Sequence, residues 1–326
     1  MMDRLGVILL NLGGPGSAAE VAPFLRALFS DREIIRLPGG PLLQPLLARL
    51  ITRLRRRSVI ANYARIGGGS PILDLTRAQA SGLAQILGDR GVDGLVTIAM
   101  RYTRPSAADA LADLEEADRL VALTLYPHYS KATTGSSLAD LERARQAIGD
   151  DRPLTVIDRY PTHEGYVESV AMKIRAGLED YPEDRRDGVV LLFSAHSLPR
   201  RFIDDGDPYL VETMRCVNAV LDRLGGERRF KLAFQSRSGP VEWLDPDTEI
   251  VIEEMAEAGE RDVLVVPISF VSDHIETLYE IDLLYGKKAR SLGIDGWRRA
   301  ESLNDSPAFL DALADLVIGA LGKAVE

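Results

Sequence analysis

Cysteine is almost missing from this chain, which has one, Cys216, in 326 residues. A single thiol excludes an internal disulfide and any zinc or iron-sulfur site that the chain would build from cysteines alone. Scarce cysteine fits a reducing cytoplasm. No apolar run approaches the length that crosses a bilayer, and the N-terminus enters a strand without a signal-peptide cleavage site. We therefore expect a cytoplasmic protein, soluble or peripheral to the inner face of the membrane.

Positive charge is also in short supply, with 39 Lys and Arg against 49 Asp and Glu and a net charge of -10. Nucleic acid is therefore not expected as a partner, because a phosphate backbone requires an excess of basic residues. An anionic ligand would need a local basic patch instead. The length of 326 residues, 46% of them apolar, favours two domains.

The familiar nucleotide and hydrolase motifs are absent too. The glycine turn Asn11-Leu12-Gly13-Gly14-Pro15-Gly16 follows an apolar strand, but it matches neither the dinucleotide spacing G-x-G-x-x-G nor the Walker spacing G-x-x-x-x-G-K-[ST]. Ser194 and Ser197 flank His196, yet no G-x-S-x-G elbow is present. The sequence supports neither nucleotide binding nor serine hydrolysis.

Buried strands alternate with helices along the whole chain, as a parallel sheet with covered faces requires. The fold class is therefore α/β, with two similar, Rossmann-like domains that each hold a four-stranded parallel sheet flanked by helices. We expect an N-terminal domain of residues 1–158 plus the last helix, 305–326, and a C-terminal domain of 159–304. Ligands of such sheets bind beyond the carboxyl ends of the strands, so we expect a cleft between the domains. The strands are predicted at 5–12, 94–100, 120–125, 154–157, 189–193, 230–234, 263–267 and 297–300.

Segment 263–282 carries the densest group of candidate functional residues. A β-branched strand breaks at Pro267, and the loop after it delivers His274 and Glu276. Glu280 falls four residues later, so the two carboxylates share one helical face. Such a group suits metal handling or proton transfer, and His196, which follows another buried strand, can lie in the same cleft. The structural alternative is a capping box between Asp273 and Glu276.

Residues 37–57 are rich in leucine and end in the basic cluster Arg55, Arg56 and Arg57. This segment, the leucine-rich lip, can form an exposed apolar surface that contacts a membrane or an apolar ligand. For most of its leucines, however, core packing is expected. The arginines provide the local basic patch that an anionic ligand requires.

Five motifs stand out at or near the ends of predicted strands and helices: Leu-Asn-Leu-Gly-Gly-Pro (10–15), Arg-Ile-Gly-Gly-Gly-Ser-Pro (65–71), Tyr-Pro-His-Tyr-Ser (126–130), Ser-Ala-His-Ser-Leu-Pro (194–199) and Ser-Asp-His-Ile-Glu-Thr-Leu-Tyr-Glu-Ile-Asp (272–282). Together they resemble the ferrochelatase family, and the resemblance runs from the first strand to residue 304. It implies the two-domain chelatase fold and a lyase that inserts Fe²⁺ into protoporphyrin IX, the last step of haem b synthesis. Such a reaction needs a base for the pyrrole protons, metal ligands and a clamp on the ring.

The resemblance also implies roles for individual residues. His196 is the proton acceptor or first metal ligand, Glu276 stands opposite as ligand or proton acceptor, and Glu280 continues the polar path. Leu284 stands where many members have a third acid. No permanently bound cofactor is expected, and no [2Fe–2S] cluster, because the cysteines of cluster-containing members are not matched. The residues expected around the porphyrin are Arg55, Tyr63, Ser70, Arg101, Tyr102, Trp243, Phe270 and His274.

Three other functions remain open on the residues. The chain can be a chelatase for coproporphyrin or for cobalt, although the glycine turn and the leucine-rich lip favour the less charged protoporphyrin. A carrier that binds a porphyrin or a metal without catalysis is the alternative of a different class, and it would not need Glu276.

Overall fold

The computed structural model describes residues 4–35 and 38–323. The chain divides into two compact units, one formed by the chain up to Arg159 together with the chain from Leu310 onward, the other by Tyr160–Phe309. The boundaries predicted from the sequence were 158/159 and 304/305. Residues 1–3 and 324–326 of the predicted first domain lie outside the described residues.

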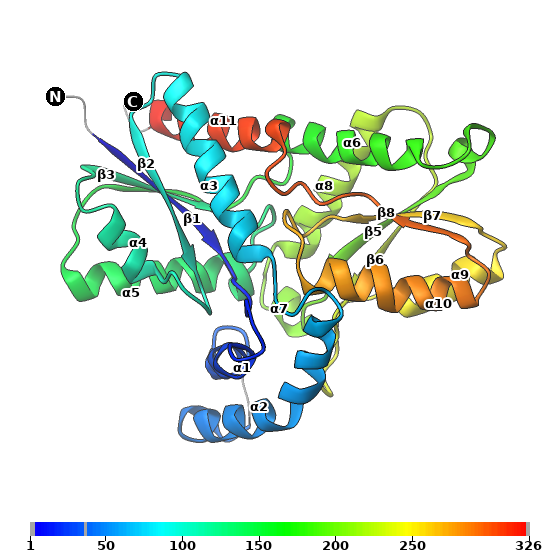
Figure 1. The fold of residues 1–326 in the computed structure, drawn as a ribbon, viewed down its shortest axis with the longest axis horizontal. Helices are drawn as coiled ribbons and strands as arrows, with labels where there is room; N and C mark the ends of the chain where they lie inside the picture. The colour runs from blue at the N-terminus through cyan, green and yellow to red at the C-terminus, as the bar shows by residue number, and fades with distance from the viewer. Residues whose placement is uncertain (1–3, 36–37, 324–326) are drawn as a thin grey trace. The chain divides into compact units, whose positions relative to one another are not determined.

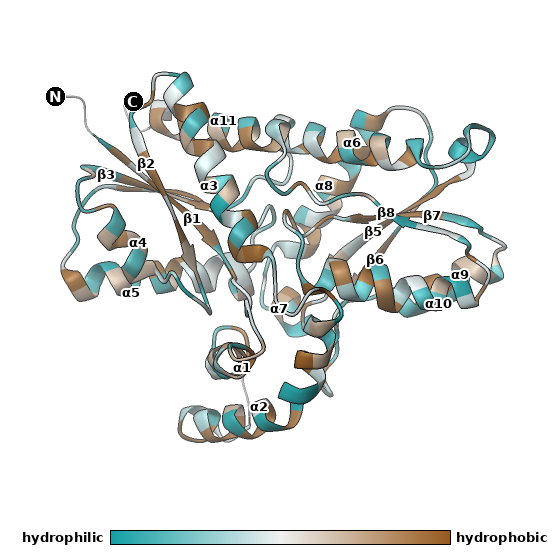
Figure 2. Cartoon of the chain, in the orientation of Figure 1, coloured by the Kyte–Doolittle hydropathy of each residue, from teal (hydrophilic) through white to brown (hydrophobic). Residues whose placement is uncertain are grey.

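Unit 1 is built on a parallel sheet of four strands in the order β2-β1-β3-β4. The strands are β1 (Leu5–Asn11), β2 (Gly94–Met100), β3 (Arg119–Thr124) and β4 (Leu154–Ile157). Every residue of the central strand β1 is buried, as its uninterrupted apolar sequence predicts. Figure 2 shows these strands as mainly hydrophobic ribbon.

Helices cover both faces of this sheet. In Figure 1, α3 (Ile72–Asp89) lies on one face, and α4 (Ala107–Asp113) and α5 (Ser136–Ile148) lie on the other. Ile8 and Leu10 of β1 belong to one buried apolar cluster with Leu111 of α4 and Leu141 of α5. The last helix, α11 (Pro307–Lys323), is held to α3 at its end by ion pairs from Arg90 to two of its aspartates.

Unit 2 repeats this plan with strands in the order β6-β5-β7-β8, again all parallel. Its strands are β5 (Val190–His196), β6 (Phe230–Gln235), β7 (Asp262–Pro267) and β8 (Gly296–Arg299). Its helices are α6 (Glu164–Glu179), η2 (Glu183–Gly188), α7 (Arg200–Asp204), α8 (Tyr209–Leu224), α9 (Thr248–Glu257), η3 (Glu276–Tyr285) and α10 (Gly286–Ser291). In Figure 1, α6 and α8 lie on one face of this sheet and α9 and α10 on the other. The predicted fold class is confirmed.

Two further helices and one turn of helix belong to unit 1. They are α1 (Val21–Ser30), α2 (Gly40–Ala64) and the π-helical turn η1 (Lys131–Gly135). Helix α2 contains most of the leucine-rich lip, of which Leu37 lies outside the described residues. The helix runs continuously through Pro45.

Core packing was expected for most of the leucines of α2, and for five of them this is wrong. The side chain of Leu42 is 89% exposed and that of Leu54 is 72% exposed, and Leu43, Leu46 and Leu50 are exposed as well. Four of these leucines recur every fourth residue, so they form a stripe along one side of the helix. No helix within residues 4–35 and 38–323 is long and apolar enough to cross a membrane.

Candidate functional site

The candidate site lies at the carboxyl edge of the unit 2 sheet. Strand β5 extends to His196, three residues further than predicted, and His196 is paired in register with Gln235 at the end of β6. The backbone amide of His196 donates to Ser269 Oγ at 2.9 Å, and Tyr209 OH donates to the His196 carbonyl at 2.9 Å. The sheet and two hydroxyl groups therefore fix the backbone from which the imidazole projects.

His196 and Glu276 are in direct contact. The distance from His196 Nδ1 to Glu276 Oε2 is 2.8 Å, so the expectation that Glu276 stands opposite His196 across a gap is wrong. Both residues belong to unit 2, where the end of β5 adjoins the start of η3. The side chain of His196 is 35% exposed and that of Glu276 is 16% exposed. The pair is therefore shielded from bulk water but still reachable by a ligand.

The two ring nitrogens of His196 have different roles. When the ring is neutral, Nδ1–H donates to the Glu276 carboxylate, and Nε2 carries the free lone pair. None of the residues in the described part of the chain forms a hydrogen bond to this Nε2. This nitrogen is the atom that can accept a proton or bind a metal ion.

The capping-box alternative for Asp273 and Glu276 is also wrong. The backbone amide of Asp273 donates to Asn304 Oδ1 at 2.9 Å instead of to Glu276. The amide of His274 donates to Thr277 Oγ1 at 3.0 Å. The carboxylate of Glu276 is thus directed away from the helix end and toward His196.

A partly buried ion network holds η3 on β8 and on the loop that follows it. Arg299, the last residue of β8, donates to both oxygens of Asp282 at 2.8 and 3.0 Å and to Asp273 Oδ1 at 3.0 Å. Asp273 also accepts hydrogen bonds from Ser302 and Asn304. Because these contacts flank Glu276 and Glu280 on both sides, they set the position of the carboxylates. The ten-residue η3 is a π-helix, a rare form that is frequently found at functional sites.

His196, Glu276 and Glu280 form what we call the acid–base group. Their surroundings shift the three pKa values in different directions. Burial alone would lower the pKa of His196, but the charge and hydrogen bond of Glu276 outweigh it and raise the pKa. Burial would raise the pKa of Glu276, but His196 lowers it overall. For Glu280, burial and the neighbouring Glu276 charge both act to raise the pKa. Two carboxylates with pKa values shifted in opposite directions are typical of acid–base sites.

Two residues of this group were missed as functional candidates. Ser236 Oγ lies 2.8 Å from Glu276 Oε2 and 2.5 Å from Glu280 Oε2. Gln235 Nε2 donates to Glu280 Oε2 at 3.1 Å and to the Glu276 carbonyl at 3.2 Å. Both follow a predicted buried strand directly, and that position was the available signal, but neither residue type is an obvious acid, base or metal ligand.

The three ring side chains of unit 2 that were predicted around the porphyrin fall into two groups. The Phe270 ring lies 4.4 Å from that of His274 and 6.2 Å from that of His196, centroid to centroid. His274 Nδ1 lies 3.0 Å from the Ser272 carbonyl, and burial lowers the pKa of His274. Trp243 pairs through its backbone with Pro199, and its buried Nε1 has no hydrogen-bond partner in the described part of the chain. Phe270 and His274 adjoin the acid–base group, and Trp243 presents an unused donor.

Ser70, a predicted residue of unit 1, joins two glycine turns. Ser70 N donates to the Pro15 carbonyl at 2.8 Å, which joins the turn at 65–71 to the turn at 11–16. A Cβ at Gly69 would lie 2.2 Å from the Gly16 carbonyl oxygen, and a Cβ at Gly14 would lie 2.9 Å from the Ser70 side chain. The glycines are therefore required by close backbone contact.

Arg101 and Tyr102 are bound to a buried acid that was not predicted. Asp31 Oδ2 accepts hydrogen bonds from Arg101 at 2.6 Å, from Tyr102 OH at 2.7 Å and from Ser136 Oγ at 2.7 Å. Burial opposes ionisation of Asp31, but these donors lower its pKa overall. Tyr102 has a raised pKa because it is buried and faces the Asp31 charge. An anionic ligand would share Arg101 with Asp31.

The two remaining predicted residues lie on α2. The Arg55 guanidinium carbon is 5.8 Å from the centre of the Phe29 ring, and Arg55 is exposed. Tyr63 is buried at the last turn of the helix, where its carbonyl accepts the amide of Gly68 at 2.8 Å. The same helix thus carries one exposed and one buried candidate.

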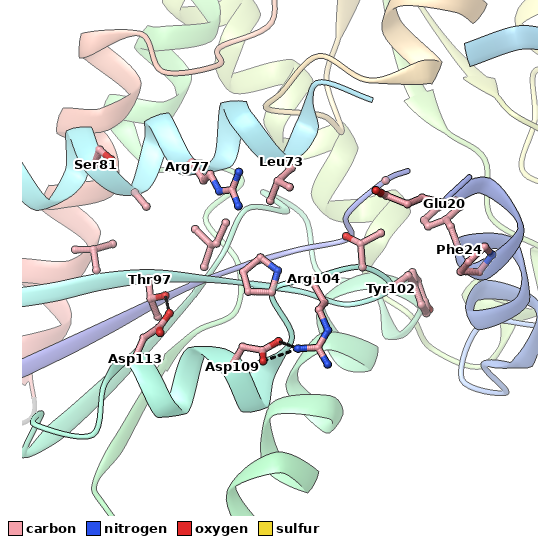
Figure 3. A pocket seen from close by; sticks show the side chains of 17 residues that line it. Glu20, Phe24, Leu73, Arg77, Ser81, Thr97, Tyr102, Arg104, Asp109 and Asp113 are labelled. Carbon is pink, nitrogen blue, oxygen red and sulfur yellow. Dashed lines mark hydrogen bonds and ion pairs between the residues drawn. The ribbon is translucent and has the colours of Figure 1, made fainter. Parts of the chain in front are cut away.

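A cavity of about 1080 Å³ opens in unit 1 beside the edge strand β2. Its lining includes Gly14, Phe24 and Tyr102, together with the ion pair between Arg104 and Asp109 (Figure 3). Of the residues predicted around the ligand, only Tyr102 lines it. Every residue of the lining belongs to unit 1, whereas the acid–base group belongs to unit 2, so the cavity contains none of that group.

No group of three or more His, Cys, Asp or Glu side chains among the described residues is arranged to hold a metal ion. The predicted metal ligands, His196 and Glu276, are two side chains that contact each other.

Comparison with known proteins decides the family. The ferrochelatase family model matches residues 4–321. The chain belongs to the ferrochelatase family. A ferrochelatase from Geotalea daltonii is 50% identical over 99% of this chain and 100% of its own length, and one from Synechocystis is 46% identical over 98% of this chain and 83% of its own length.

Solved structures give the same fold for this ferrochelatase-family chain. SirB from Bacillus subtilis with Fe³⁺ has a TM-score of 0.56 at 10% identity, with 97% of this chain and 95% of that chain covered. At that identity the likeness establishes the fold alone. Family membership establishes that this chain is a metal chelatase, an enzyme of haem synthesis that acts by metal insertion.

Proposed function

We propose that this chelatase inserts Fe²⁺ into protoporphyrin IX to form protohaem, with His196 as the acceptor of pyrrole protons. The observation that carries the proposal is the 2.8 Å contact between His196 Nδ1 and Glu276 Oε2, which leaves Nε2 as the reactive nitrogen. Insertion replaces two pyrrole N–H protons with one Fe²⁺, so two protons must leave the ring. A base with a nearby carboxylate meets that requirement.

Glu276 acts on His196 as the third group of a hydrolase triad acts on its histidine. It holds the tautomer with the proton on Nδ1, and it stabilises the imidazolium that forms when Nε2 accepts a proton. An imidazole and a carboxylate are also ligands that Fe²⁺ accepts, so His196 and Glu276 are the proposed first contacts of the incoming metal. We propose that the enzyme holds no permanent cofactor. We also propose that it has no iron-sulfur cluster, because the chain has one cysteine.

The porphyrin ring is proposed to contact the aromatic group beside the acid–base pair. Phe270 and His274 form a tilted pair 4.4 Å apart, next to His196. Trp243 adds an indole with a spare N–H donor. In unit 1, Arg101 is the proposed partner of a propionate, and Arg55, Tyr63, Ser70 and Tyr102 remain predicted contacts.

The test is Fe²⁺ insertion into protoporphyrin by the wild type, His196→Ala and Glu276→Gln, with porphyrin binding measured in parallel. We expect insertion by the wild type and porphyrin binding by all three proteins, with insertion lost in His196→Ala. Porphyrin binding without insertion by the wild type would favour the carrier. Faster insertion into coproporphyrin, or of Co²⁺, would identify the other chelatase specificities.

The exposed side of α2 is proposed to contact an anionic membrane surface. Leu42, Leu46, Leu50 and Leu54 form the apolar stripe, and exposed arginines at 49, 53, 56 and 57 accompany it. Each basic residue near an anionic bilayer contributes about 1 kcal/mol, and leucine side chains add apolar burial. A chain with Leu46, Leu50 and Leu54 changed to Ser should lose sedimentation with phosphatidylserine vesicles and keep its Fe²⁺ insertion rate. Equal sedimentation by wild type and variant would refute the contact.

A further inference from the structure

Strand β2 is an unprotected edge of the unit 1 sheet. It has seven residues, none of them charged or proline, and it pairs on one side only, with β1. Proteins usually shorten, charge or cover such edges, because an open edge pairs with other chains. The other sheet edges are protected in these ways: β4 has four residues, β8 carries Arg298 and Arg299, and β6 carries Lys231 and is bridged at Phe234 to Asp247. Among the described strands, β2 alone presents a long edge without these protections.

The outer side of β2 carries free backbone groups. The Asp93 carbonyl and the Arg101 amide both bond to β1, so the odd-numbered residues between them face β1 and the even-numbered ones face outward. The outward N–H and C=O groups of Gly94, Val96 and Ile98 form no hydrogen bond to any residue within 4–35 and 38–323. These groups can pair with an extended segment of about five residues.

The cavity of about 1080 Å³ follows this edge, because residues 96–98 of β2 form part of its lining. Helix α3 forms one wall and carries Arg77, and α4 forms the other and carries Asp113 (Figure 3). Within the described part of the chain, Arg77 has a single ion pair, at 3.5 Å with Asp74, and Asp113 accepts a hydrogen bond from Thr97 but has no ion pair. The two walls therefore carry opposite charges that are largely uncompensated.

The walls restrict what can enter this groove. An extended segment turns alternate side chains to opposite walls, so one set meets Arg77 together with the apolar side chains of Leu73 and Ala80, and the other set meets Asp113. A second copy of this chain fits poorly. A symmetric pair of β2 strands would bring α3 against α3 and α4 against α4, and equal charges would meet.

We propose that this groove binds an extended segment of a partner protein as a fifth strand of the unit 1 sheet, with an acidic side chain toward Arg77 and a basic side chain toward Asp113. Backbone hydrogen bonds to β2 supply affinity, and the alternate side chains supply selectivity. The acid and the base lie on opposite faces of the segment, so an odd number of positions separates them. This interaction is separate from the chemistry of metal insertion.

The probe is a fluorescein-labelled heptapeptide, Val-Thr-Glu-Lys-Val-Thr-Val, added to the full chain. Its Glu and Val side chains lie on one face, and its Lys and Thr side chains lie on the other. Two analogues carry backbone N-methyl groups, on the odd or on the even positions. We expect the parent peptide to bind, one analogue to bind about 30-fold more weakly, as the loss of two hydrogen bonds requires, and the other to bind like the parent. Weaker binding of the odd-methylated analogue indicates an antiparallel segment, and of the even-methylated one a parallel segment.

Arg77→Glu tests the charge of the α3 wall and should weaken binding of the parent peptide about fivefold, the upper range for an exposed ion pair. Arg143→Glu is the matched control, because the Arg77 and Arg143 side chains are 60% and 55% exposed and each contacts an aspartate three residues before it. The control should bind like the wild type. A chain with both Arg77→Glu and Asp113→Lys should prefer the peptide in which Glu and Lys are exchanged.

Hydrogen exchange locates the bound peptide. The amides of Val96 and Ile98 should exchange more slowly when the peptide is present, whereas those of Leu95 and Thr97 already face β1 and should change little. Failure of the parent peptide to bind, equal binding by the parent and both methylated analogues, or unchanged exchange at 96 and 98 would each overturn the proposal. Slow exchange there without peptide, increasing with the concentration of the chain, would assign the edge to a second copy and overturn it too.

Discussion

Replacing Glu276 with Gln should change the pH dependence and the maximum rate of metal insertion in separable ways. The substitution keeps the size of the side chain and removes its charge. In the wild type the charge and hydrogen bond of Glu276 raise the pKa of His196 above its usual value of 6.5 against the effect of burial. In the variant burial still lowers the pKa of His196 and only the charge of Glu280 still raises it, so the pKa of His196 falls below its wild-type value.

The sign of the pH effect follows from the form of His196 that reacts. A base must be neutral to accept a pyrrole proton, so wild-type insertion should decline as the pH falls through the raised pKa of His196. In Glu276→Gln this acid decline should move to lower pH. The maximum rate should fall nevertheless, because the imidazolium produced by proton transfer has lost its carboxylate partner.

A hydrogen bond to a charged group contributes about 1.5–3 kcal/mol. Since 1.36 kcal/mol corresponds to a factor of ten, the maximum insertion rate should drop roughly 10- to 150-fold. Single-turnover insertion, followed by porphyrin absorbance across pH 5 to 9, measures both quantities. Glu280→Gln is the control, since it keeps the His196–Glu276 contact and its acid decline should move less. A decline in Glu276→Gln that moves to higher pH, with an undiminished maximum rate, would refute this reasoning.

Three further predictions concern stability. Gly69→Ala should lower Tm strongly, since its Cβ would meet the Gly16 carbonyl oxygen at 2.2 Å; an unchanged Tm would contradict the close contact of the two turns. Asp31→Asn should destabilise the chain by about 1.5–3 kcal/mol in urea unfolding, because it removes the charged acceptor of Arg101 and leaves that guanidinium only its 3.5 Å ion pair with Asp140. The Asp273 carboxyl has a lowered pKa, so its stabilisation is complete above its usual value of 3.8 and is lost as the pH falls through the lower folded value. The urea midpoints of the wild type and Asp273→Asn should therefore converge toward pH 2; a difference that persists there would contradict the assignment.

Most of the fold could be predicted from the sequence because the strands are buried on both faces. Gly94–Met100 and Leu154–Ile157 were predicted with the bounds that the structure shows. The polar residues at the strand ends were less predictable. His196 was placed after β5 although it belongs to it, because Ser194, Ala195 and His196 do not read as an apolar run.

The site could be predicted only in part, because contacts between distant segments depend on side-chain direction. The residues of the acid–base group were recognised by type, but the 2.8 Å contact between His196 and Glu276 was expected to be a gap. Ser236 and Asp31 were missed, since a serine in a turn and an aspartate after a helix are ordinary surface residues in most sequences. The exposed leucines of α2 were underestimated, because burial is the usual fate of leucine.

The shared strand order of the two units has a consequence for how this enzyme can be altered. In both sheets the first strand is central and its last residue pairs with the end of the second strand: Asn11 with Met100 in one, His196 with Gln235 in the other. Equivalent positions thus carry an inert amide in one sheet and the proposed base in the other, on the same apolar framework. The Asn11 side chain is buried and bound to Thr76 and to the Leu12 amide, so a catalytic group designed at the tip of the first sheet would have to replace those contacts and gain access to a ligand.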